Sequence, residues 1–79
     1  MRNRVDISRF NISSDELEKL IDTWIIGRNA KRDREILKLK LIDGLTFERL
    51  AETVELSDRR VKDIVYKSLD ILIKHINIH

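Results

Sequence analysis

Two amphipathic helices joined by a very short connection constrain this chain more than any other feature. In residues 46–72, apolar side chains recur twice at helical spacing, and only Glu55, Leu56 and Ser57 remain for the connection. The first stripe comprises Phe47, Leu50, Ala51 and Val54, and the second comprises Val61, Ile64, Val65, Ser68, Leu69 and Leu72. So short a connection brings the two helices against each other, and the pattern therefore predicts a helix-turn-helix.

Each of these two helices also begins with a capping residue. Thr46 and Ser57 stand directly before the apolar stripes, where a hydroxyl oxygen accepts a hydrogen bond from a free N–H group of the first turn. Turns of this kind often place glycine at a residue with positive φ, and this chain has Glu55 there. A residue with a Cβ in that conformation costs about 1 kcal/mol, which such a turn tolerates.

The outward face of the second helix contains the candidate binding residues. Arginine and lysine reach guanine edges and phosphates when a helix lies in the major groove of DNA. Ser57 adds a hydroxyl group for a phosphate oxygen at the helix N-terminus. The predicted DNA-binding residues are Ser57, Asp58, Arg59, Arg60, Lys62, Asp63, Tyr66 and Lys67. The alternative interpretation is an amphipathic helical hairpin whose charged face is only solvated.

A further helix is predicted at Ile12–Ile26. Ser13 and Glu16 have the spacing of a capping box, and Gly27 follows the last apolar residue as a signal for the end of the helix. We expect Trp24, on the apolar face of this helix, to anchor the core, because an aromatic side chain supplies much of the buried area of a small domain.

The next predicted helix spans Arg28–Asp43, with Asn29 as its cap and Gly44 after its end. Its expected core residues are Ala30, Ile36, Leu37, Leu39, Leu41 and Ile42. It is also the most basic stretch of the chain, with Lys31, Arg32, Arg34, Lys38 and Lys40. The usual interpretation of such a run is a solvated face with ion pairs, and phosphate contact beside the groove is the alternative.

The two ends of the chain are candidate surfaces for self-association. Residues 1–11 are predicted to form an arm that is mobile, lies along DNA, or pairs with a second copy of the chain. The recognition helix is expected over about residues 58–76, and the C-terminal run holds Ile71, Ile73, Ile76 and Ile78. Because one recognition helix covers few base pairs, we expect a homodimer, formed through this run rather than through Val5 and Ile7.

Composition narrows the fold class and the function. The 79 residues contain no proline and only two glycines, which favours a single small all-α domain over residues 12–79. There is no cysteine, and His75 and His79 lack a third ligand, so we expect no metal and no cofactor. No arrangement of residues suggests an enzyme. Without a signal peptide or an apolar run near about 18 residues, we expect a cytoplasmic protein with no membrane contact.

Residues 33–72 resemble region four of bacterial primary-type sigma factors. The resemblance implies double-stranded DNA as a partner, since that region binds the −35 element of promoters, and RNA polymerase as a further candidate, since it docks on the polymerase flap. The matching residues are Arg34, Glu35, Leu37, Leu39, Gly44, Leu45, Thr46, Glu48, Ala51, Ser57, Arg60, Val61, Ile64, Leu69 and Leu72.

Two departures from the pattern of this family change the expected specificity. The family often places arginine and then glutamate after the cap, where this chain has Asp58 and Arg59. Asp63 stands where the family has a base-reading glutamine. A carboxylate repels phosphate and cannot read adenine as glutamine does, so the recognised sequence is expected to differ from a consensus −35 element.

The chain has no room for the other promoter-binding and polymerase-binding regions of a sigma factor. We therefore expect a small sequence-specific DNA-binding transcription regulator of the phage or mobile-element type. One alternative is a protein-binding adaptor that docks on RNA polymerase or on a sigma factor, which the net charge of only +2 favours. Another is the DNA-recruiting small subunit of a phage packaging enzyme.

Overall fold

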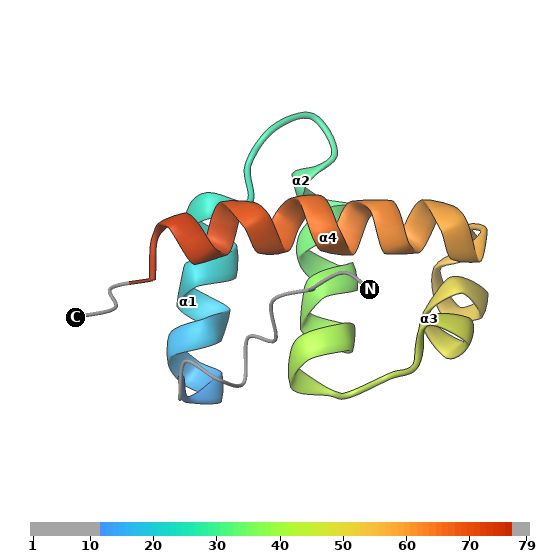
Figure 1. Cartoon of the computed structure of the whole chain (residues 1–79), viewed down its shortest axis with the longest axis horizontal. Coiled ribbons are helices and arrows are strands. Elements are labelled where there is room, and N and C mark those ends of the chain that lie inside the picture. The colour runs from blue at the N-terminus through green and yellow to red at the C-terminus, as the bar shows by residue number, and fades with distance from the viewer. Residues whose placement is uncertain (1–11, 77–79) are drawn as a thin grey trace, which may run out of the picture.

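The computed structural model describes residues 12–76, and four α-helices follow one another in this part of the chain (Figure 1). They are α1 (Ser14–Trp24), α2 (Ala30–Leu37), α3 (Phe47–Val54) and α4 (Asp58–Lys74); a π-helix, η2 (Lys38–Ile42), continues directly from α2. The described residues contain no strand, which confirms the all-α class. The predicted arm, residues 1–11, lies outside the described residues, as do residues 77–79.

The long helix α4 is the element on which the others pack. Its 17 residues give a length of about 25 Å at 1.5 Å per residue, and it contacts α1, α2 and α3. In Figure 1 it runs along the longest axis of the molecule, with α3 beside its first turns and α1 beside its last. The buried residues of α4 are Val61, Ile64, Val65, Ser68, Leu69 and Leu72, which confirms the predicted stripe in full. None of the described helices has the length and apolarity to span a membrane.

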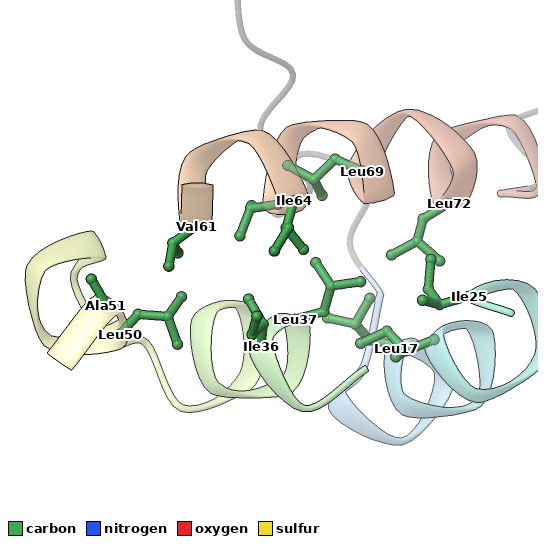
Figure 2. Close-up of a cluster of buried hydrophobic side chains, with 12 residues drawn as sticks. Leu17, Ile25, Ile36, Leu37, Leu50, Ala51, Val61, Ile64, Leu69 and Leu72 are labelled. Carbon is green, nitrogen blue, oxygen red and sulfur yellow. The ribbon is translucent and has the colours of Figure 1, made fainter. Parts of the chain in front are cut away.

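One hydrophobic cluster joins all four α-helices (Figure 2). Leu50 from α3 and Val61 from α4 are both fully buried, and so are Ile36 and Leu37 from α2. Burial of a side chain of this size contributes about 1.5–3 kcal/mol, so these contacts supply much of the domain's stability. They also fix the position of α3 against the start of α4, which is the predicted helix-turn-helix.

Three predicted helix caps are present. The hydroxyl oxygens of Ser13, Thr46 and Ser57 accept hydrogen bonds from the backbone N–H groups three residues later, at 3.2, 3.1 and 3.1 Å. Glu16 completes the capping box by accepting from the Ser13 N–H at 3.3 Å. The fourth prediction was wrong, because the side chain of Asn29 makes no capping hydrogen bond.

The predicted helix Arg28–Asp43 is two different helices. Its α-helical part begins at Ala30 and ends at Leu37, where η2 takes over. The Asp43 N–H donates to the Lys38 carbonyl oxygen at 3.1 Å, a bond between residues five apart. Leu37 and Ile42 have this spacing, so the wider turn keeps both apolar side chains toward the core. Periodicity that assumes an α-helix cannot show such a change.

The prediction that Trp24 anchors the core was wrong. Its side chain is 39 % exposed and stacks on the ring of His75, with 3.6 Å between ring centroids and 2° between planes. The predicted end at Ile26 was also too late, because α1 ends at Trp24 and the backbone of Ile25 is extended. Ile25, only 3 % exposed, therefore takes the core position after Ile21.

Candidate nucleic-acid interface

The turn between α3 and α4 sets the geometry of the predicted site. Glu55 adopts φ 60° and ψ 43°, the left-handed conformation that lets the chain reverse within three residues. Its N–H remains bonded to the Ala51 carbonyl, and the Leu56 N–H also donates to that oxygen at 3.1 Å. α4 therefore starts at Asp58 with its apolar face already directed toward α2 and α3.

Burial of this apolar face leaves the predicted binding residues on the opposite side of α4. All eight are exposed except Tyr66, which is half-buried. Six of them line one open hollow of about 610 Å³, namely Ser57, Arg59, Arg60, Lys62, Asp63 and Tyr66. Asp58 and Lys67 do not line it. The structure therefore brings most of the predicted residues together on one surface.

Helical spacing explains why these side chains share a surface. Arg59, Lys62, Asp63 and Tyr66 follow one another at i, i+3, i+4 and i+7, which places them along one side of α4. The surface thus combines donors on Arg59 and Lys62 with acceptor oxygens on Asp63. Donors and acceptors on one exposed helix face are what base edges in a major groove require.

The N-terminus of α4 is ordered by its cap. The Ser57 hydroxyl oxygen accepts the Arg60 N–H at 3.1 Å, and its O–H hydrogen remains able to donate to an anion. The partial positive charge at a helix start favours a phosphate at this place. Asp58, exposed in the first turn, opposes that attraction with its own negative charge.

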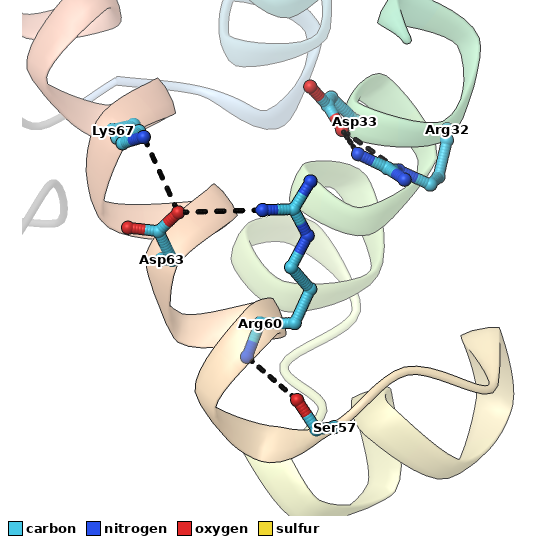
Figure 3. A network of polar contacts seen from close by, with 6 residues as sticks. All are labelled: Arg32, Asp33, Ser57, Arg60, Asp63 and Lys67. Carbon is cyan, nitrogen blue, oxygen red and sulfur yellow. Dashed lines mark hydrogen bonds and ion pairs between the residues drawn. The ribbon is translucent and has the colours of Figure 1, made fainter.

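Asp63 forms ion pairs with two cationic side chains on the exposed face of α4 (Figure 3). Its Oδ2 atom lies 3.9 Å from Nη1 of Arg60 and 3.5 Å from Nζ of Lys67. All three side chains are at least 45 % exposed, so each pair contributes no more than about 1 kcal/mol. Arg60 and Lys67 are therefore held only weakly by Asp63, and each has further N–H donors that can bind phosphate while it remains beside the carboxylate. Arg59 has no ion pair with any described residue.

Phe47 is a part of the surface that sequence analysis assigned only to the core stripe. The ring is half-buried, and its centroid lies 5.8 Å from that of Tyr66 at a tilt of 60°. The ammonium groups of Lys40 and Lys62 lie 4.3 and 5.7 Å from its centroid, within cation–π range. Phe47 thus contacts Tyr66 and Lys62, two residues that line the hollow. An aromatic residue in an apolar stripe gives no signal for this role.

The basic stretch before α3 mainly joins elements of the domain. Lys38 Nζ lies 2.9 Å from Asp22 and 3.7 Å from Glu18, and the hydrogen bond to Asp22 raises the pKa of Lys38 despite an opposing effect of burial. Arg34 Nε donates to the Ile25 carbonyl at 2.8 Å, and Lys40 Nζ donates to the Leu45 carbonyl at 3.0 Å. Such intramolecular contacts favour a structural role for these cations over phosphate binding.

No family model, curated protein or solved structure matches the chain. The resemblance to region four of sigma factors therefore stays a prediction.

Proposed function

We propose that this chain is a sequence-specific DNA-binding transcription regulator in which α3 and α4 form the helix-turn-helix and α4 enters the major groove. The observation that best supports the proposal is the hollow along α4, which gathers Arg59, Lys62, Asp63 and Tyr66 on one exposed helix face. The capped N-terminus of α4 lies at one end of the same hollow and offers an anion-binding position.

The side chains of this surface have different roles in the proposal. Arg59, which has no ion pair in the described structure, reads a guanine edge through its O6 and N7 acceptors. Arg60, Lys62 and Lys67 neutralise phosphates, and Ser57 donates a hydrogen bond to a phosphate oxygen. Such phosphate contacts determine affinity and register, whereas base contacts determine the sequence recognised.

Selection from random DNA duplexes tests the proposal. We expect the full chain to enrich one short motif and to lose affinity for that duplex as salt rises, because cations on α4 release counterions from phosphates. Enrichment of no motif, together with binding that does not change with salt, would reject the proposal.

We also propose that the chain binds DNA as a homodimer, because a net charge of +2 gives one small module little affinity for DNA. Three large apolar residues of the described chain are exposed. Trp24 is the last residue of α1, Ile26 follows two residues later, and Ile71 is on α4. Trp24 stacks on His75 at the C-terminal end of α4, and Ile71 lies in the last turn of α4, so both are at the end of this helix opposite Arg59. Arg59 lies twelve positions before Ile71, about 18 Å of helix, so two copies joined end to end there, with their α4 helices in line, place their Arg59 residues about 36 Å apart. That spacing approaches one turn of DNA.

A protein-binding adaptor is the second candidate, and the near-balance of charge favours it. The chain has 16 basic and 14 acidic residues, and Asp58 and Asp63 stand among the cations of the α4 surface. An adaptor that docks on RNA polymerase or on a sigma factor needs no excess of positive charge. Capture of purified polymerase that survives high salt, with no binding to selected or random DNA, would favour the adaptor over the DNA-binding regulator.

A further inference from the structure

The two carboxylate oxygens of Asp63 have different surroundings. Both of its ion pairs, with Arg60 at 3.9 Å and with Lys67 at 3.5 Å, end on Oδ2. In Figure 3 the other oxygen, Oδ1, points away from Arg60, and neither dashed line ends on it. Within the described part of the chain, no side chain donates a hydrogen bond to Asp63. One oxygen therefore has two cationic partners, and the other has none among the described residues and remains as an acceptor.

We infer that Asp63 is a base-reading residue that selects cytosine in the bound DNA. The inference rests on the proposed function, and it names the base that one side chain of the surface recognises. An ionised carboxylate accepts hydrogen bonds and donates none. It therefore needs a donor on the floor of the major groove.

Only two bases present such a donor in the major groove. Cytosine offers its N4 amino group, and adenine offers its N6 amino group beside the N7 acceptor. The lone pair of N7 repels a carboxylate, as do the O6 and N7 acceptors of guanine and the O4 acceptor of thymine. Cytosine is therefore the base that a carboxylate favours.

Arg60 and Lys67 allow a carboxylate to enter the groove at all. An isolated anion on the recognition helix would be repelled by the phosphates on both sides of the groove. The two cations on Oδ2 offset this repulsion, because they stay beside Asp63 and are themselves attracted by phosphate. The two ion pairs reduce the repulsion between the carboxylate and the phosphates, and they leave Oδ1 to accept a hydrogen bond from the base.

The position of Arg59 predicts where the cytosine lies. Arg59 is one helical turn before Asp63 on the same side of α4, about 6 Å along the axis. Successive base pairs are spaced about 3.4 Å, so the two side chains reach base pairs about two steps apart. The expected motif contains a guanine read by Arg59 and, within about two base pairs, a cytosine read by Asp63.

The test compares two matched substitutions in the full chain. Asp63→Asn replaces the carboxylate with an amide, which pairs with the N6 and N7 atoms of adenine. Asp70→Asn makes the same change at an exposed aspartate farther along α4 that does not line the hollow. Each variant and the wild type select duplexes from the same random pool, and affinities are then measured for the four bases at each selected position.

We expect Asp63→Asn to change one position of the motif from cytosine to adenine. At that position the wild type should prefer cytosine by roughly 10-fold or more, the range of a single base contact. Asp70→Asn should keep the motif of the wild type.

If Asp63→Asn instead raises affinity for every duplex equally and keeps the motif, Asp63 only neutralises Arg60 and Lys67, and the inference is wrong while the proposed function stands. If the wild type selects no motif, both the proposed function and the inference are wrong.

Discussion

The ammonium group of Lys38 lies 2.9 Å from the carboxylate of Asp22, and this contact joins η2 to α1. The hydrogen bond to Asp22 raises the pKa of Lys38 above its usual value, even though burial acts in the opposite direction. Because the folded-state pKa is the higher one, the contribution of Lys38 to stability is complete below the unfolded pKa of about 10.4. It is lost as pH rises through the folded pKa.

This contact predicts a stability difference that disappears at alkaline pH. Lys38→Gln should lower the free energy of unfolding by about 1 kcal/mol or less from pH 7 to 9, since the pair is partly exposed. The variant and the wild type should converge as pH rises through the folded-state pKa of Lys38, which lies above its usual value. Urea denaturation measures this, with Lys38→Arg as a control that stays charged at high pH. A difference that is constant up to pH 12 would exclude an ionic contribution.

The left-handed conformation of Glu55 predicts a stabilising substitution. Its φ of 60° costs a residue with a Cβ about 1 kcal/mol, and glycine avoids that cost. Glu55→Gly should therefore raise the free energy of unfolding by roughly 0.5 kcal/mol, after the added freedom of the unfolded chain is subtracted. Glu55→Ala removes the charge and keeps the Cβ, so it should give little or none of this gain. Equal effects of the two substitutions in urea denaturation would attribute the change to charge.

The proposed homodimer predicts that mass depends on concentration. Light scattering should show a rise from 9.4 kDa toward twice that value, because Trp24, Ile26 and Ile71 become buried between two copies. Ile71→Glu should prevent the rise. Thr53→Glu, an exposed site on α3, should leave it unchanged.

A mass that stays at 9.4 kDa up to high concentration would contradict the proposed homodimer. A dimer that Ile71→Glu does not weaken would place the contact elsewhere on the chain. Of the predicted run of four isoleucines, Ile73 packs against the domain's own core, and Ile78 lies outside the described residues.

The helix-turn-helix was predictable because each of its signals is local. The caps at Thr46 and Ser57 and the stripe on α4 depend only on spacing along the chain, and the structure has them as expected. Glu55 was expected to have positive φ because of its position in the turn, and it does. Local signals that agree in this way leave few alternative folds.

The features that sequence analysis missed depend on contacts between distant residues. Trp24 lies outside the core because α1 ends there and His75, from the end of α4, supplies a ring to stack on. The π-helix and the ring contact between Phe47 and Tyr66 likewise follow from packing between elements. For the site, spacing predicted which residues share a face, whereas the pairing of Arg60 and Lys67 on one oxygen of Asp63 required coordinates.

The most direct test of the account measures the affinity of Arg59→Ala for the selected duplex. Arg59 is exposed and has no ion pair in the described structure, so its removal changes little besides contact with DNA. The matched control is Arg28→Ala, which removes an exposed arginine in the connection between α1 and α2.

We predict that Arg59→Ala weakens binding to the selected duplex by about 1–3 kcal/mol and relaxes specificity at one guanine, measured by fluorescence anisotropy. Arg28→Ala should bind as the wild type does. Equal affinities of Arg59→Ala and wild type for the selected duplex, with the same preference at every position, would contradict the assignment of α4 as a recognition helix.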